Sequence, residues 1–122
     1  MKPPNVKKHL LDVLKAASIE AVSLREDAKS SKFVLVTSSG GPGRSNRIVQ
    51  TVQVTLGMYA LTPGLAADLA TGVEELIYSL PAEATSPVAA VPWASTPYES
   101  PDPDRPNLAR LVGTYQLNVI CR

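Results

Sequence analysis

The stretch that decides the fold is Ile48-Val49-Gln50-Thr51-Val52-Gln53-Val54-Thr55-Leu56-Gly57-Met58. Apolar and polar side chains alternate along it. The side chains of Val52, Val54, Leu56 and Met58 point to one side of an extended chain, and those of Thr51, Gln53, Thr55 and Tyr59 to the other. This alternation predicts one long strand with a single buried face, as in an antiparallel sheet that is covered on one side.

An amphipathic helix is predicted directly after this strand, over residues 65–80. Thr62 is a suitable N-cap, and Pro63 occupies the first helical position, where its missing N–H costs nothing. The apolar stripe consists of Leu65, Leu69, Val73, Leu76, Ile77 and Leu80. These residues recur at steps of three and four, so we expect them to pack on the apolar face of the strand.

A proline-rich crossing, residues 81–106, leads to a last alternating strand over residues 108–121. Leu111, Tyr115, Leu117, Val119 and Cys121 share one face of that strand. We expect Cys121 to be a packing residue. Inside the crossing, residues 88–94 are predicted to form an edge strand, because Pro87 and Pro92 cannot donate hydrogen bonds to a neighbouring strand.

The first third of the chain begins with a helix that Asn5 caps, followed by a short extended piece at residues 19–24 and a strand at 32–37. A flexible, glycine-rich hairpin loop is predicted over residues 39–46. The expected fold is therefore α/β of the α+β kind, one domain over residues 1–122. A mostly antiparallel sheet of four to five strands carries two packed helices, in the order α-β-β-β-α-β-β.

The composition, 44% hydrophobic and 19% charged, is typical of a globular domain. A single cysteine excludes a disulfide within the chain. No apolar run has the length of a signal peptide or of a membrane span, so we expect a cytosolic protein without membrane contact.

Charge is distributed unevenly. Residues 1–47 contain nine Lys/Arg and four Asp/Glu, a net charge of +5, and residues 48–122 contain three and seven, a net charge of −4. This division is compatible with a nucleic-acid face, with complementary surfaces between copies, or simply with one solvated basic and one solvated acidic helix.

Residues that could perform chemistry do not form an active site. The segment after Gly40 lacks the lysine of a phosphate-binding loop, and His9, which we expect at the surface, has no orienting partner. Asp102 and Asp104 lack further oxygen ligands at the spacing of a calcium loop, so we expect them to pair with Arg105 or with a neighbouring chain. We predict no catalytic, cofactor-binding or metal-binding residues.

Candidate interface residues lie in two segments. Three are in the hairpin loop, which we expect to become ordered against a partner: Gly41, Arg44 and Arg47. Five are in the proline-rich crossing: Trp93, Tyr98, Asp102, Asp104 and Arg105. Trp93 and Tyr98 are of the type that anchors protein interfaces, although covering one end of the core is an equal alternative.

Several motifs together resemble the tail terminator (tail completion) proteins of bacteriophages with long, non-contractile tails, and related head–tail joining proteins. They are the N-terminal helix starting Val6-Lys7-Lys8-His9-Leu10-Leu11, the glycine-rich hairpin at 40–47, the strand at 48–56, the helix at 66–76, Pro101-Asp102-Pro103-Asp104, and the closing strand at 110–122.

This resemblance implies a small α/β subunit that forms a hexameric ring in the virion, assembled in the host cytoplasm. The ring would cap the finished tail tube, stop its polymerisation and join the tail to the head connector. Its partners would be further copies of itself, the tail tube protein, the connector protein, and genomic DNA that crosses the lumen without sequence-specific contact. Proteins of this family are not enzymes and need no cofactor.

Two other functions stay open at this point. One is a different head–tail joining, head-completion or tail tube protein; a tube protein would form long tubes rather than single rings. The other is a small basic nucleic-acid-binding module, although Phe33 is the only aromatic residue before Tyr59 and stacking platforms need more. Nucleic-acid binding that weakens steeply with salt would favour that module.

Overall fold

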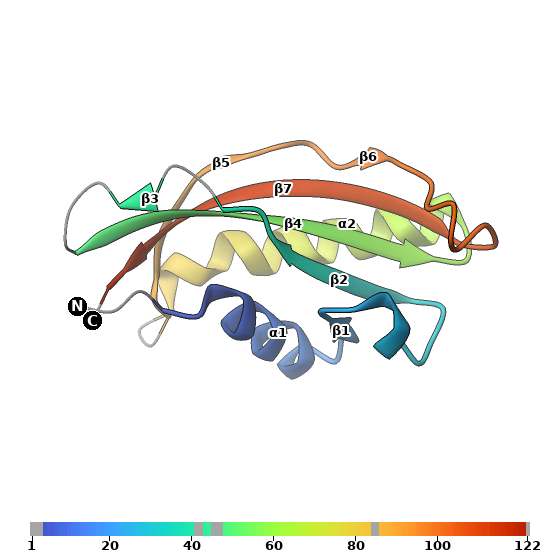
Figure 1. The fold of residues 1–122 in the computed structure, drawn as a ribbon, viewed down its shortest axis with the longest axis horizontal. Helices are drawn as coiled ribbons and strands as arrows, with labels where there is room; N and C mark the ends of the chain where they lie inside the picture. Colours follow the sequence, from blue (N-terminus) through green and yellow to red (C-terminus); the bar gives the residue numbers. More distant parts are fainter. Residues whose placement is uncertain (1–3, 41–42, 45–47, 84–85, 122) are drawn as a thin grey trace.

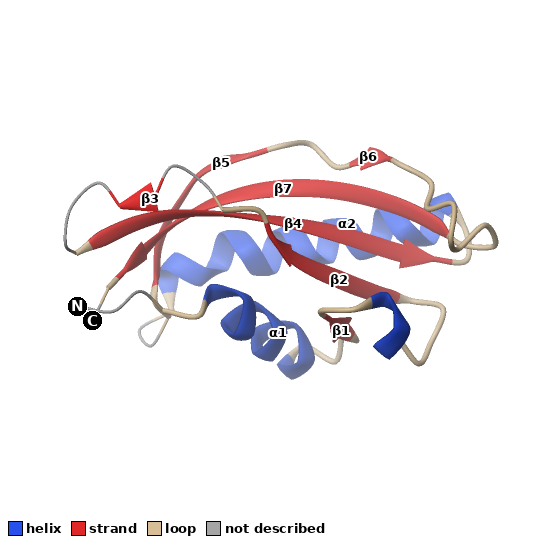
Figure 2. Ribbon diagram, in the orientation of Figure 1, coloured by secondary structure: helices blue, strands red, loops and turns tan. Residues whose placement is uncertain are grey.

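The computed structural model describes residues 4–40, 43–44, 48–83 and 86–121, and has two helices on one face of a twisted sheet (Figures 1 and 2). Its elements are α1 (Val6–Ala16), β1 (Ala21–Val22), the 3-10 turn η1 (Arg25–Asp27), β2 (Phe33–Ser38), β3 (Gly43–Arg44), β4 (Val49–Ala60), α2 (Pro63–Ser79), the 3-10 turn η2 (Leu80–Ala82), β5 (Val88–Ala94), β6 (Tyr98–Glu99) and β7 (Ala109–Ile120). The predicted α+β fold is confirmed. The two-residue strands β3 and β6 were not predicted.

The sheet is built around its two longest strands. Its strands lie in the order β1-β2-β4-β7-β5, and β3 and β6 add short pairings to β4 and β7. The β4–β7 pair is antiparallel, with twelve matched positions from Val49 opposite Ile120 to Ala60 opposite Ala109. The pairing of β1 with β2 is parallel, whereas the other strand pairings of the described residues are antiparallel.

Both helices begin where their capping residues predict. The backbone N–H of Lys8 donates to Asn5 Oδ1 at 3.1 Å, and that of Leu65 donates to Thr62 Oγ1 at 3.2 Å. Each cap satisfies an N–H group that the first turn of a helix leaves without a partner. At its other end α2 gives way to η2, so the helix ends one residue before Leu80 and two before Pro81.

One hydrophobic core lies between the helices and the sheet. α1 packs on β1 and β2, while α2 packs on β4 and β7. The predicted apolar faces supply core side chains: Leu69, Val73 and Ile77 of α2; Val54, Leu56 and Met58 of β4; and Tyr115, Leu117 and Val119 of β7. Leu10 and Leu14 of α1 and Val34 and Val36 of β2 complete the core. Cys121 is buried, as expected of a packing residue.

Leu65 departs from the predicted stripe and is 47% exposed. Successive steps of four residues drift by about 40° around a helix of 3.6 residues per turn, so Leu65 lies about 120° from Ile77. Leu65, the first residue of the predicted stripe, therefore lies outside the core.

The second face of the sheet is also partly covered, so the prediction of a single buried face is wrong at one end. Tyr59 lies among the polar positions of β4, yet its side chain is fully buried. Its ring stacks on that of Phe33, with centroids 4.4 Å apart. The proline-rich crossing passes this end of the sheet (Figure 1), and its Asp102 accepts a hydrogen bond from the Tyr59 hydroxyl. Both rings are buried.

Two glycines in the central strands make room for tyrosines two residues further on. A Cβ atom at Gly57 would lie 3.3 Å from Tyr59 Cε1, and one at Gly113 would lie 3.1 Å from Tyr115 Oη. The two tyrosine rings lie on opposite faces of the sheet. Each ring covers backbone that a glycine leaves bare, as aromatic side chains do in other sheets.

Gly113→Ala is expected to destabilise the fold by about 1–3 kcal/mol, because the buried ring of Tyr115 must shift within a packed core. Gly72→Ala is the matched control. A Cβ atom there meets nothing within 4 Å on the exposed side of α2, so alanine should stabilise by up to about 1 kcal/mol. Urea unfolding of both variants measures the two effects. Equal effects of the two substitutions would contradict the packing of Tyr115 over Gly113.

Leu69→Ala and Leu117→Ala should each lower the free energy of unfolding by about 2–5 kcal/mol, the range for deleting a buried leucine side chain. Leu65→Ala shares a helix with Leu69 but should cost less than about 0.5 kcal/mol, because Leu65 is exposed. Thermal or urea unfolding separates these values. A small cost at Leu69 or Leu117 would mean that the two apolar faces do not pack together.

Candidate interaction surfaces

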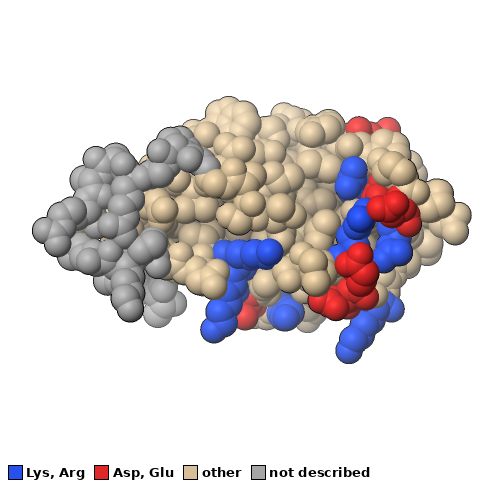
Figure 3. All heavy atoms as spheres, viewed as in Figure 1, with Lys and Arg blue, Asp and Glu red and all other residues tan. Residues whose placement is uncertain are grey.

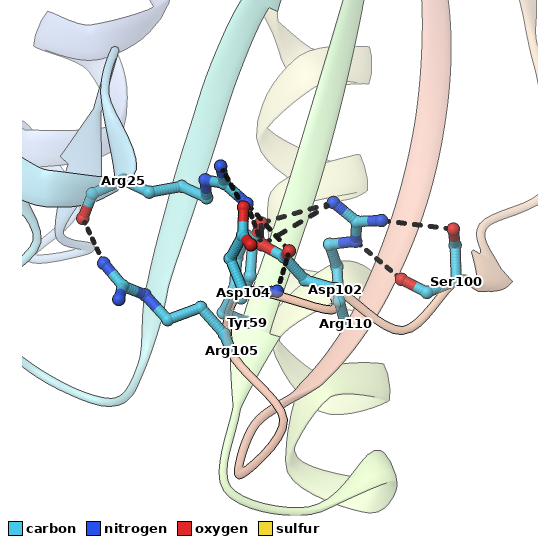
Figure 4. Close-up of polar contacts among 7 residues, drawn as sticks. All are labelled: Arg25, Tyr59, Ser100, Asp102, Asp104, Arg105 and Arg110. Carbon is cyan, nitrogen blue, oxygen red and sulfur yellow. Dashed lines mark hydrogen bonds and ion pairs between the residues drawn. The ribbon is translucent and has the colours of Figure 1, made fainter.

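A polar cluster centred on Asp102 holds the proline-rich crossing against the sheet (Figure 4). Arg25 of η1 donates from Nη1 to both carboxylate oxygens of Asp102, at 2.7 and 2.6 Å. The hydroxyl of Tyr59, at the end of β4, donates to Asp102 Oδ2 at 2.7 Å. The backbone N–H of Asp104 donates to Asp102 Oδ1 at 3.0 Å. The carboxylate is therefore fully engaged inside the chain.

Two more arginines complete the cluster. Arg110 of β7 donates from Nε to the backbone carbonyl of Ser100 at 2.6 Å, and its Nη1 lies 4.0 Å from Asp102 Oδ2. Arg105 donates from Nη2 to the carbonyl of Arg25 at 3.2 Å. The cluster thus connects η1, β4, β7 and the crossing, which are far apart in sequence.

Charge and burial oppose each other at Asp102. Burial by itself raises the pKa of Asp102, but hydrogen bonds from Arg25, Tyr59 and the backbone of Asp104 outweigh it and lower the pKa to about 2. In turn, hydrogen bonds to Asp102 and Asp104 raise the pKa of Arg25 above its ordinary value. Burial and the bond to Asp102 raise the pKa of Tyr59. At neutral pH the cluster is an ion pair with a neutral tyrosine.

The prediction that Asp102 and Asp104 pair with Arg105 of the same chain is wrong. Arg25, not Arg105, pairs with them: its Nη2 also lies 2.9 Å from Asp104 Oδ2. A turn in which the N–H of Arg105 donates to the carbonyl of Asp102 directs the Arg105 side chain toward η1 instead. Asp102 is buried and has no free acceptor to offer a partner, whereas Asp104 is 71% exposed.

Trp93 and Tyr98 lie on the face of the sheet that carries no helix, here called the open face. Trp93 is paired with Gln116 and Tyr98 with Val112, and directly opposed residues of antiparallel strands point to the same side. Both side chains are about half exposed, at 50% and 55%. The alternative that these aromatics cover an end of the core is therefore wrong.

The hairpin residues can be placed only in part. Gly41 and Arg47 lie outside the described residues. Arg44 belongs to β3, where its backbone is paired with Gln50. The flexibility and interface role of the 39–46 loop stay predictions.

His9 is half-buried rather than at the surface, because α1 brings it within 3.4 Å of the hydroxyl of Ser86, measured at Nε2. Ser86 Oγ also accepts from the backbone N–H of Val88, which fixes the start of β5. Within the described parts of the chain, no three His, Cys, Asp or Glu side chains gather where they could hold a metal ion.

The helical layer separates charge. α1 carries Lys7, Lys8, Lys15 and Asp12, a net charge of +2 (3 − 1). α2 carries Asp68, Glu74 and Glu75 and no Lys or Arg, a net charge of −3. α1 covers the β1–β2 side of the sheet and α2 the β4–β7 side, so the two helices form a basic and an acidic flank.

In comparisons with known proteins, no family model and no curated protein matches this chain. Among the described residues, no helix is both long enough and apolar enough to span a membrane.

The polar cluster contains three residues that the sequence did not single out: Arg25, Tyr59 and Arg110. The burial of Tyr59 could have been suspected from the sequence, since it is the one large aromatic residue among the polar positions of β4. Arg25 had none, because it is separated from Asp102 by 77 positions in the chain.

Asp102→Asn is expected to lower the free energy of unfolding by about 1–3 kcal/mol, because an amide places N–H donors against the guanidinium and removes the buried charge. Asp104→Asn should cost only about 0–1 kcal/mol, because that carboxylate is exposed. Guanidinium unfolding of the two variants provides the comparison.

The stabilisation from Asp102 should depend on pH in a defined window. A carboxylate with a folded pKa of about 2, below its unfolded value of 3.8, stabilises fully above the unfolded pKa and stops doing so as pH falls through the folded one. Stability of the wild type should fall between about pH 4 and pH 2 more than that of Asp102→Asn. If the stability of the two proteins fell equally over this pH range, the ion pair at Asp102 would be contradicted.

Proposed function

We propose that this chain is a structural virion subunit that assembles into a ring, which caps the phage tail tube. The resemblance to tail terminator proteins implies that the ring is a hexamer. In this proposal the ring ends polymerisation of the tube and joins the tail to the head connector. Two kinds of support exist: the sequence motifs that resemble tail terminator proteins, and an element order that agrees with the fold this resemblance implies.

The observation that carries the proposal is the separation of charge between the two helices. A closed ring requires heterologous contacts, in which one surface of a subunit meets a different surface of the next. A basic flank at α1 and an acidic flank at α2 are such unlike surfaces, and they cover different strands within the same helical layer. Lys8 and Lys15 are exposed on the first flank, as are Asp68 and Glu75 on the second.

Charge alone would hold such a ring weakly. Exposed ion pairs contribute about 0–1 kcal/mol each, so they select the orientation of neighbouring subunits more than they drive assembly. Apolar contacts must supply the rest of the affinity. Leu65 and Tyr78 are both exposed on α2 and are available for that role on the acidic flank.

The proposal is tested by reversing charge on one flank at a time. Lys8→Glu combined with Lys15→Glu, or Asp68→Lys combined with Glu75→Lys, should raise the dissociation constant between subunits about ten-fold or more at low salt. All four substitutions in one chain should restore assembly, because the opposed charges are then exchanged rather than lost. Glu99→Lys, away from both helices, is the control.

Light scattering across protein concentration gives the mass of each variant. Contact between the flanks would be contradicted if neither double variant changed the dissociation constant between subunits. It would also be contradicted if the quadruple variant assembled as weakly as the double variants. Wild-type protein that is monomeric at every concentration and also fails to bind tail tube ends would refute the proposed function itself.

A further inference from the structure

We infer that the open face is a second contact surface, which pairs with the open face of another copy of this chain. The inference does not depend on the ring, because the open face and the two helical flanks are different surfaces. Its residues come from β2, β4, β5, β6 and β7, and include Leu35, Gln53, Trp93, Tyr98, Val112 and Gln116.

The open face carries almost no charge. Among the described strand residues that point to this side, Arg110 is the one ionisable cation or anion, and its guanidinium is already bonded to Ser100. In Figure 3 the charged side chains in view gather at the right end and along the lower edge of the molecule, and the central and upper part in view shows none. Depletion of charge together with exposed Trp and Tyr is the composition of the centre of protein interfaces.

The polar groups of the open face suit a copy of the same face. Thr51 donates to Asn118 at 2.8 Å, and Gln116 donates to Gln53 at 3.4 Å, so these groups form cross-strand ladders. Hydroxyl and amide groups both donate and accept. Across a two-fold axis every contact occurs twice, so a donor of one copy that meets an acceptor of the other does so in both directions, whereas a face of like charges would repel its own copy. A strongly charged partner would find no complementary charge here.

The shape offers a place for an aromatic side chain of the facing copy. A hollow of about 260 Å³ opens on this face, and Leu35, Thr55, Tyr98, Arg110 and Val112 are among the residues that line it. Trp93 is nearby on the edge strand β5 and is not used by the core of its own subunit.

The available area predicts a weak pair. Beyond the end that Asp102 closes, the face is about seven residues long on β4, β7 and β5 and about four on β2, or roughly 400 Å² per copy. Twice this area falls in the size class of transient complexes, below the roughly 1,200 Å² of stable ones. We therefore expect association that depends on concentration rather than a permanent dimer.

The test uses the wild-type chain in about 1 M salt, where contacts between charged flanks are screened. As concentration rises to about 1 mM, the mass from light scattering should approach twice the 13.0 kDa of one chain. Trp93 is the only tryptophan, so its emission should shift to the blue over the same range.

Gln116→Lys places a charge at the centre of the open face and should abolish both the rise in mass and the blue shift of the tryptophan emission. Thr71→Lys, which adds the same charge on the exposed side of α2, should leave them intact. Trp93→Gln is a second variant that leaves the core untouched and should weaken pairing at least five-fold. Unfolding curves establish that each variant is folded.

A wild-type mass of 13.0 kDa at all concentrations, or equal masses for Gln116→Lys and Thr71→Lys, would overturn the inference. If larger assemblies persist in high salt, Gln116→Lys should still halve their mass. The charge-reversed flank variants should pair normally, so failure of the ring and failure of this pair are distinguishable.

Discussion

The register of β4 against β7 is the constraint on which the rest of the structure depends. Twelve consecutive pairs place the core side chains of both strands on one side: Val54, Leu56 and Met58 of β4, and Tyr115, Leu117 and Val119 of β7. A slip by one residue would turn these side chains toward water and would move Gly57 and Gly113 away from the tyrosines they accommodate. Both helices, the short strands and the proline-rich crossing are attached to this pair.

The two faces of that sheet have different consequences. On one side, burial against α1 and α2 provides the core, and the outer surfaces of the helices keep unlike charges apart. On the other side, β5 and β6 pair the crossing with β7, and the ion pair of Asp102 with Arg25 fixes the end of the crossing over one end of the sheet. The remainder stays open, uncharged and bordered by Trp93 and Tyr98. A subunit with several unlike surfaces is suited to assembly with neighbours in more than one direction.

Local patterns predicted most of the fold because they depend on neighbours in sequence. Alternation located β4 and β7, and Asn5 and Thr62 located the starts of the helices. Contacts between distant segments were not predictable in this way. The burial of Tyr59 and the pairing of Asp102 with Arg25 depend on how the crossing folds back, and Arg105, adjacent in sequence, was the wrong partner. The predicted apolar stripe of α2 also included Leu65, because spacing along the chain does not show the angular drift that takes this residue out of the core.

The central claim is that neighbouring subunits meet through unlike surfaces and close into a ring. Electron microscopy of the purified chain at low salt tests this claim most directly, because closed and open assemblies differ in shape. The account predicts closed rings of uniform diameter that do not grow into tubes. Open-ended tubes would indicate a protein that polymerises rather than terminates, and a field of small particles without rings at high concentration would contradict the claim.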